Sequence, residues 1–240
     1  MPPHHPFGMR MFCLPHAGGG ASMFRNWSAP GLQVWGVQLP GRENRIMEDP
    51  FQQMQPLVDI LIAELQPYLH EPYLIYGHSM GALVAYHVCL QLQQRGLPLP
   101  EHLWVSGCAA PLHFRQEAWH LLSDQDFIGR ILSLGGTPPE VFEEPLLRPL
   151  VLKLLRADFQ LVETAPAVTG KLGCPIGAVA GIQDPHATPA DMQHWQDCTT
   201  EDFAEDFELL TVQGDHFLVR THSQHLLQHM RARLKGVLSL

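Results

Sequence analysis

A serine stands at the centre of the pentapeptide GHSMG, residues 77–81 of this 240-residue chain. A Gly-x-Ser-x-Gly pattern is typical of a nucleophile held on a sharp turn between a strand and a helix. The flanking sequence supplies both elements, because the β-prone run Tyr73–Tyr76 precedes the pentapeptide and the apolar run Ala82–Gln94 follows it. Ser79 is therefore a candidate nucleophile, with the N–H groups of the following helix near a developing oxyanion. The alternative is a buried structural serine.

A serine hydroxyl needs a base to take up its proton, and that base needs a partner to orient it. Two turns that follow late strands offer these groups: Asp184 comes after the strand candidate Ile176–Ala180, and His216 comes after Phe207–Val212. The chain order Ser, Asp, His is that of hydrolases with the strand-to-helix serine turn. We predict that His216 acts as general base and then acid, and that Asp184 orients it.

Two other carboxylates remain open as the acid of this triad. Asp191 and Asp215 lie in the same two loops, and in either case Asp184 would serve only to form the turn before Pro185. The chain has 15 histidines, most of them expected at the surface, but the GDHF turn sets His216 apart from the others.

Stabilising an oxyanion requires two backbone donors. One is predicted to be the N–H of Met80, directly after the nucleophile, and the other the N–H of Ala17, in the run HAGGG (16–20) that follows the strand candidate Met11–Leu14. Glycines in that run let the backbone approach a substrate carbonyl closely. The run lacks the Lys-Ser/Thr of a phosphate-binding loop and the spacing of a dinucleotide fingerprint, so nucleotide binding is not expected.

Short apolar runs alternate with longer amphipathic runs along most of the chain. Further strands are predicted at Val34–Leu39 and Leu103–Ser106, and further helices at Gln52–Leu69 and His222–Leu234. This alternation predicts an α/β protein of the α/β-hydrolase type, a doubly wound, mostly parallel sheet with helices on both faces. No linker divides the chain, so we expect a single domain over residues 1–240.

The stretch 112–173 interrupts the alternation. It contains no convincing strand, and its helical patterns lie at Asp124–Leu134 and Leu146–Asp158. Long insertions in compact domains are often functional, so we interpret this stretch as a helical lid inserted between two strands. The alternative is a set of helices that pack on the sheet without a gating role.

Composition and charge exclude several classes of function. The chain has 15 Lys and Arg against 24 Asp and Glu, a formal net charge of −9, which argues against a nucleic-acid partner. No apolar run reaches the ~20 residues of a membrane helix, and the first nine residues do not resemble a signal peptide. The five cysteines form no Cys-x-x-Cys pair. We expect a cytoplasmic protein with reduced thiols and no membrane partner.

Three histidines, His222, His225 and His229, share one face of the last predicted helix. Three imidazoles could bind a metal, but the sequence indicates no Cys, Asp or Glu ligand on a second element. A solvated helix face is the favoured interpretation, and neither a metal nor a cofactor is predicted.

Several segments beyond the pentapeptide resemble the type II thioesterases, the external, editing α/β-hydrolases that accompany nonribosomal peptide and polyketide synthases. They are FCLPHAGG (12–19), LPGRE (39–43), RADF (156–159) and GDHF (214–217). The resemblance extends from about Arg10 to the last helix. The second and third segments are the more specific, because general esterases do not share them.

The resemblance implies an enzyme that hydrolyses aberrant or stalled acyl thioesters on the phosphopantetheine arm of acyl or peptidyl carrier proteins. It assigns the triad to Ser79, Asp184 and His216 and the oxyanion hole to Ala17 and Met80. No cofactor is implied, and a monomer is expected. A general carboxylesterase on small esters, an acyltransferase and a carrier-binding module without catalysis are the alternatives.

The same resemblance indicates that Arg156 and Asp158 anchor the lid and take no part in catalysis. Carrier proteins are usually acidic, so the net charge of −9 has the wrong sign for long-range attraction. We therefore expect a transient encounter through a local basic or apolar patch, near Arg42, Arg45 or Arg115.

Overall fold

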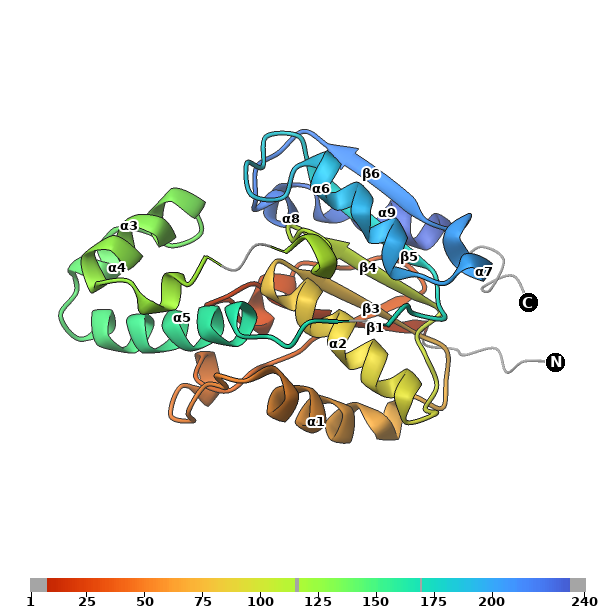
Figure 1. Ribbon diagram of the computed structural model, residues 1–240, viewed down its shortest axis with the longest axis horizontal. Helices are drawn as coiled ribbons and strands as arrows, with labels where there is room; N and C mark the ends of the chain where they lie inside the picture. Colours follow the sequence, from red (N-terminus) through yellow and green to blue (C-terminus); the bar gives the residue numbers. More distant parts are fainter. Residues whose placement is uncertain (1–7, 115–116, 169, 234–240) are drawn as a thin grey trace.

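The computed structural model describes residues 8–114, 117–168 and 170–233, and a parallel sheet forms its centre (Figure 1). The described strands are paired in the order β2-β1-β3-β4-β5-β6, and each pairing is parallel. The predicted α/β fold with a mostly parallel sheet is confirmed. The strands are β1 (Met9–Leu14), β2 (Leu32–Gly36), β3 (Tyr73–His78), β4 (His102–Ser106), β5 (Ile176–Gly181) and β6 (Glu208–Val212).

Apolar side chains on both faces of the sheet explain why helices cover both. Along β1, Phe12 and Leu14 join one buried cluster, whereas Met11 and Cys13 join a second cluster on the opposite face. This alternation follows the two-residue period of a strand. The first face is covered by α1 (Met54–Leu65) and α2 (Met80–Gln94), and the second by α8 (Leu218–Thr221) and α9 (Ser223–Arg233).

Short helices fill most of the connections between these elements. Of the 3-10 turns, η4 (Pro111–His113) and η6 (His194–Cys198) lie near the site described below. The others are η1 (Ala21–Phe24), η2 (Glu43–Arg45), η3 (Gln66–Tyr68) and η5 (Trp119–Leu121), and the remaining short α-helices are α6 (Pro189–Gln193) and α7 (Glu201–Ala204).

The predicted elements are confirmed in type, and most differences are at their ends. The helix expected over Gln52–Leu69 is divided, because α1 ends at Leu65 and Pro67 lies in the separate turn η3. Proline lacks the N–H that would continue an α-helix, which accounts for the division. The helix expected to reach Leu234 is described as far as Arg233, and Leu234 lies outside the described residues.

The segment 112–173 is helical, as predicted, and has its own apolar cluster. Its helices are α3 (Asp124–Leu134), α4 (Glu140–Glu143) and α5 (Leu147–Glu163). Figure 1 shows α3 and α4 set apart from the sheet on the left, with α5 running from them back toward it. Their shared cluster contains Trp119, Phe127, Ile131, Phe142, Leu152 and Leu155.

The second half of α5 belongs to the main core, because Leu161 and Val162 are buried there against the sheet-covering helices. The helix therefore continues to Glu163, past the end predicted at Asp158. One helix thus joins the separate cluster of α3 and α4 to the body of the molecule.

The order of the strands determines where a site can form. The chain passes from β1 to β2 on one side and then returns to β3 on the other side of β1. In open parallel sheets, ligands bind at the carboxyl ends of the strands where the strand order reverses in this way. The loop after β1 and the turn after β3 meet at this point. No helix in the described ranges is long and apolar enough to cross a bilayer.

Candidate active site

Ser79 occupies a strained turn between β3 and α2. Its backbone has φ 54° and ψ −119°, on the positive-φ side that residues other than glycine rarely adopt. A Cβ on Gly77 would lie 2.3 Å from the carbonyl oxygen of Gly81, and a Cβ on Gly81 would lie 2.2 Å from that of Leu14. Both glycines are therefore required by close approach of the backbone, and α2 begins directly after the serine.

The side chains of Ser79, His216 and Asp184 form a continuous chain of contacts. His216 Nε2 lies 3.1 Å from Ser79 Oγ, and His216 Nδ1 lies 2.8 Å from Asp184 Oδ2. Asp184 follows β5 and His216 follows β6, so the carboxyl ends of neighbouring strands deliver both to the serine. The structure thus brings together the three residues that the sequence predicted, and both titratable groups are buried.

The carboxyl group of Asp184 is held in its ionised form. Burial by itself raises the pKa of Asp184, but the His216 imidazole and the N–H groups of His186 and Ala187 outweigh that effect. The net pKa lies below its usual value. A negative charge is therefore in place beside the Nδ1 edge of His216 at neutral pH.

The two other carboxylates considered for the triad serve local turns. Asp191 completes a capping box with Thr188 at the start of α6, accepting from the Thr188 N–H at 3.0 Å and hydroxyl at 2.6 Å. Asp215 accepts a hydrogen bond from the Phe217 N–H at 2.8 Å. The carboxylate that contacts His216 is that of Asp184.

Two further imidazoles lie beside His216, and the sequence reasoning gave them no role. His78 is fully buried, with Nδ1 2.8 Å from the Ser106 hydroxyl and its ring 5.4 Å from that of His216. Burial holds the pKa of His78 well below its usual value and lowers the pKa of His16 to about 4. Both rings are neutral at pH 7, which leaves Asp184 as the charged neighbour of His216 within this group. Each lies inside a motif already noted, HAGGG or GHSMG, which is where a signal could have been sought.

Both predicted oxyanion donors line the same cavity as Ser79. Ala17 comes from the loop after β1 and Met80 is the first residue of α2. Within the described part of the chain, neither N–H is taken up by a protein acceptor. The loop is shaped by a turn in which the Gly19 N–H donates to His16 O at 2.9 Å, and by Gly18 at φ 75°.

A buried ion pair holds the same loop from the outside. Arg42 donates to both carboxylate oxygens of Asp158 at 2.8 Å, and the two side chains are only 4% and 2% exposed. Asp158 also accepts from the Gly18 N–H at 2.7 Å, while Arg42 donates to Gly19 O at 3.1 Å. The pair, called here the Arg42–Asp158 clamp, therefore ties the oxyanion loop to α5.

The clamp corrects one prediction. Arg42 was expected near a docking patch for a partner, but its guanidinium is buried against Asp158 and is not available at the surface. Arg45 is more exposed and is paired with Glu48. Arg115 lies outside the described residues.

Arg156 and Asp158, predicted together as anchors of the inserted segment, make different contacts. Arg156 donates to His120 O at 2.8 Å and to Asp124 at 2.7 Å, and its guanidinium lies 4.6 Å from the centre of the Phe127 ring. These contacts join α5 to the start of α3. Asp158 instead connects α5 to the oxyanion loop.

A cavity of about 350 Å³ opens beside Ser79. One wall comes from loops at the edge of the sheet and the other from the segment 112–173. This volume lies at the lower end of the range for small-molecule sites, roughly 300–1,000 Å³. The apolar side chains that line it are Cys108, Phe114, Trp119, Leu134, Phe159 and Val162.

The helix-face histidines near the C-terminus do not form a common site in the described structure. His229 Nε2 lies 2.8 Å from Glu208 Oε1, and His222 Nδ1 lies 2.8 Å from the Thr221 hydroxyl. Within residues 8–114, 117–168 and 170–233, the group with metal-compatible spacing lies elsewhere, at His113, His194 and Asp197.

Comparison with known proteins agrees with this geometry. The family model described as a thioesterase domain matches residues 9–234. The chain belongs to the thioesterase family. It is 35% identical over 236 residues to the gramicidin S biosynthesis protein GrsT of Aneurinibacillus migulanus, covering 96% of this chain and 91% of GrsT.

Two solved thioesterase structures are similar over nearly the whole chain. RedJ, from the prodiginine pathway of Streptomyces coelicolor, has a TM-score of 0.83 at 35% identity and covers 95% of this chain and 87% of its own. YbtT, a type II thioesterase of the yersiniabactin NRPS/PKS pathway, has a TM-score of 0.82 at 30% identity, with coverages of 95% and 94%. The predicted resemblance to thioesterases is confirmed, and the chain is a thioester hydrolase.

Proposed function

We propose that this thioesterase is a type II enzyme that removes aberrant or stalled acyl groups from the phosphopantetheine arms of acyl or peptidyl carrier proteins. The setting is nonribosomal peptide or polyketide biosynthesis, as the names of GrsT and YbtT indicate for those relatives. The observation that carries the proposal is the chain of contacts Ser79–His216–Asp184 beside a cavity with apolar side chains.

The first half of the reaction transfers the acyl group to the enzyme. Ser79 Oγ attacks the thioester carbonyl carbon while His216 Nε2 takes up the hydroxyl proton, and Asp184 stabilises the resulting imidazolium. The N–H groups of Ala17 and Met80 donate to the tetrahedral oxyanion. When the C–S bond breaks, His216 returns the proton to the leaving sulfur, and the pantetheine thiol departs from an acyl-serine.

The second half regenerates the serine. Water attacks the acyl-serine as His216 accepts a proton from it, and the same two N–H groups stabilise the second oxyanion. Collapse of this intermediate breaks the bond to Ser79 Oγ, which regains its proton from His216, and the carboxylic acid leaves. Thioesters are activated acyl donors, so a pocket with weak selectivity still suffices to clear many small acyl groups.

We propose further that residues 1–240 form one α/β-hydrolase domain in which residues 112–173 act as a lid. The apolar cluster of the segment and its share of the cavity wall support this role. The cavity volume favours short and medium acyl groups. We expect the enzyme to act as a cytoplasmic monomer without a cofactor, and we expect neither nucleic acid nor membrane as a partner.

A panel of acyl-loaded carrier proteins tests this function. Carriers that bear acetyl, malonyl, aminoacyl and longer acyl groups are incubated with the enzyme, and release is followed by the mass of the carrier. We expect release from carriers at higher kcat/KM than from p-nitrophenyl esters of the same acyl groups. Faster turnover of the soluble esters would favour the general carboxylesterase, and acyl transfer to an added amine or alcohol would favour an acyltransferase.

A further inference from the structure

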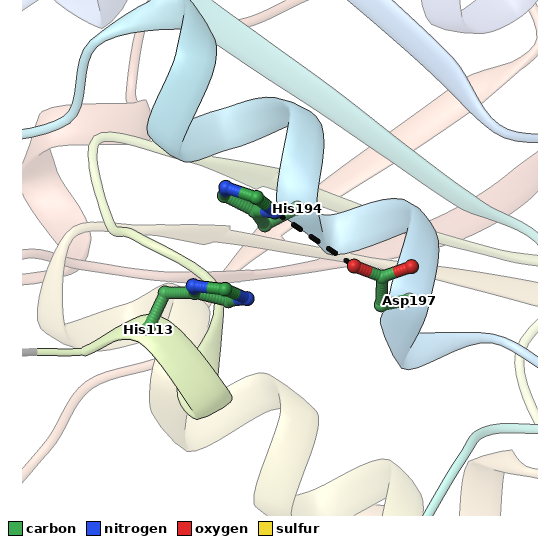
Figure 2. A group of neighbouring side chains, drawn as sticks. All are labelled: His113, His194 and Asp197. Carbon is green, nitrogen blue, oxygen red and sulfur yellow. Dashed lines mark ion pairs between the residues drawn. The ribbon is translucent and has the colours of Figure 1, made fainter.

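Three side chains with metal-binding atoms lie together at the rim of the cavity. Figure 2 shows His113 reaching from η4 toward η6, which carries His194 and Asp197. One ligand atom from each side chain lies within 4.8 Å of the other two, and His194 Nδ1 is 3.7 Å from Asp197 Oδ2. All three side chains are exposed. We call this group the rim cluster.

We propose that the rim cluster binds a divalent transition-metal ion such as Zn²⁺. Imidazole nitrogens suit Zn²⁺, Ni²⁺ and Cu²⁺, and a carboxylate completes a mixed set of the kind that these ions accept. His194 and Asp197 are three residues apart on one helical turn, and His113 adds a third ligand from a separate segment. Water would fill the remaining coordination positions.

The side chains need only a small adjustment to converge on one ion. Ligands of a tetrahedral Zn²⁺ at bond lengths of ~2.0–2.2 Å lie about 3.3 Å apart, so the cluster must contract slightly. The two imidazoles are stacked, with ring centres 3.8 Å apart and planes inclined by 12°. Their lone pairs run nearly parallel in this arrangement, so one ring must tilt to direct its nitrogen at a shared ion. Exposure leaves both rings free to tilt.

The backbone beneath the ligands is already fixed. Trp195, next to His194, is fully buried, and its indole N–H donates to Cys108 O at 2.7 Å. On the other side, the His113 N–H donates to Ala110 O at 2.8 Å. These contacts hold η4 and η6 next to each other, so binding does not have to bring together distant segments. An ion therefore has to order only exposed side chains.

The position of the rim cluster gives metal binding a consequence for the enzyme. His113 lines the same cavity as Ser79. An ion shared with η6 would fix the His113 side chain at the rim and restrict movement of that wall. We expect bound Zn²⁺ to slow thioester hydrolysis reversibly, with recovery when a chelator removes the ion.

Metal binding is measured directly with the full chain after chelator treatment. Zn²⁺ is titrated into wild-type protein by calorimetry, and Co²⁺ serves as a spectroscopic substitute. The test variant is His113→Ala with His194→Ala, a second variant is Asp197→Asn, and the matched control replaces the exposed His70 and His225 by Ala. Circular dichroism and melting temperature establish that each variant is folded.

We expect wild-type protein and the control to bind one equivalent of Zn²⁺ at micromolar concentration, with a four- or five-coordinate Co²⁺ spectrum. The double variant should bind at least 10-fold more weakly, since two of three ligands are lost, and Asp197→Asn should be intermediate. Undiminished binding by the double variant, or no binding by the wild type at micromolar Zn²⁺, would overturn the proposal. Because the readout is binding, this outcome is independent of the carrier-protein assay.

Discussion

At the scale of single residues, the chemistry depends on which carboxylate faces His216. Asp184 does so at 2.8 Å while also accepting N–H groups from His186 and Ala187. A carboxylate fixed in this way selects the imidazole tautomer whose Nε2 can accept the Ser79 proton. His16 and His78 add no positive charge that would oppose the imidazolium.

Replacing Asp184 by Asn should leave the fold intact and remove most of the activity. The amide no longer stabilises the imidazolium or the required tautomer, so we expect kcat to fall by about 10⁴-fold. Steady-state hydrolysis of an acyl thioester measures this loss.

Asp191→Asn and Asp215→Asn are the matched controls, because both carboxylates serve turns in the same two loops. We expect kcat within a few-fold of wild type for both, and a loss of stability of at most ~1 kcal/mol for the helix cap of Asp191. Equal loss of activity in Asp191→Asn and Asp184→Asn would show that Asp184 is not specifically the partner of His216.

Sequence reasoning reached Ser79 and His216 because each stands in a distinctive turn directly after a predicted strand. It could not choose among Asp184, Asp191 and Asp215, since all three follow the same two strands and all are common in turns. The burial of Arg42 was also beyond it. Arginine is usually exposed, and its partner Asp158 is 116 residues away in the chain.

At the scale of elements, the Arg42–Asp158 clamp connects three segments that are distant in sequence. It joins the loop after β2, the oxyanion loop after β1 and the helix α5 of the inserted segment. A charged pair buried to this extent is costly unless its hydrogen bonds are satisfied, and here both partners also bind backbone groups. We infer that the clamp positions the loop that carries the Ala17 N–H.

Arg42→Lys should reduce kcat more than it raises KM. Lysine keeps the charge but cannot reproduce the two parallel hydrogen bonds of the guanidinium, so the oxyanion loop loses its fixed position. The loss should approach, and not exceed, the ~10²–10³-fold cost of removing one oxyanion donor. Steady-state kinetics on one acyl thioester separate kcat from KM.

Arg45→Lys is the control for this prediction, because Arg45 is partly exposed and paired with Glu48. It should keep wild-type kinetics. Asp158→Asn leaves Arg42 buried without its counter-charge and should destabilise the fold by about 3–5 kcal/mol. A folded Arg42→Lys variant with unchanged kcat would contradict the positioning role.

Elements were easier to predict than their ends or their packing. The two-residue period of the strands and the helical spacing of α1 and α3 are local properties of the sequence, and α3 has the predicted bounds Asp124–Leu134. Ser123 caps its start and Gly135 ends it in a left-handed conformation. The end of α5 depends instead on burial of Leu161 and Val162 against other elements, which no local pattern reveals.

At the scale of the whole molecule, buried neutral histidines make stability depend on pH. Burial lowers the pKa values of His16 and His102 from 6.5 to about 4 and holds that of His78 well below its usual value. The unfolded chain binds protons at these positions between pH 6.5 and 4, whereas the folded chain does not. Stability is therefore fully present above the unfolded pKa and is lost as pH falls through that window.

Urea unfolding at several pH values should show this loss. Each such histidine contributes a slope of up to about 1.4 kcal/mol per pH unit within the window. His102→Gln should make the fall in unfolding free energy less steep, while His225→Gln, at an exposed position, should leave it unchanged. An unfolding free energy that stays constant between pH 6.5 and 4.5 would contradict neutral burial of these imidazoles.

The overall charge of −9 is the property of the whole molecule that bears most on its proposed partner. Two acidic proteins gain no long-range attraction, so the encounter with a carrier depends on local contacts and the specificity must come from the pantetheine arm and the acyl group inside the cavity.

The most direct test of the account is Ser79→Ala with an acyl-loaded carrier protein as substrate. Intact-protein mass spectrometry follows both proteins, so that carrier release and an acyl-enzyme are recorded in one experiment. We predict that wild type regenerates the free carrier thiol through an acyl adduct on Ser79, and that Ser79→Ala slows release by 10⁴-fold or more, an order-of-magnitude figure for loss of a serine nucleophile. Release by Ser79→Ala at the wild-type rate would contradict the central claim.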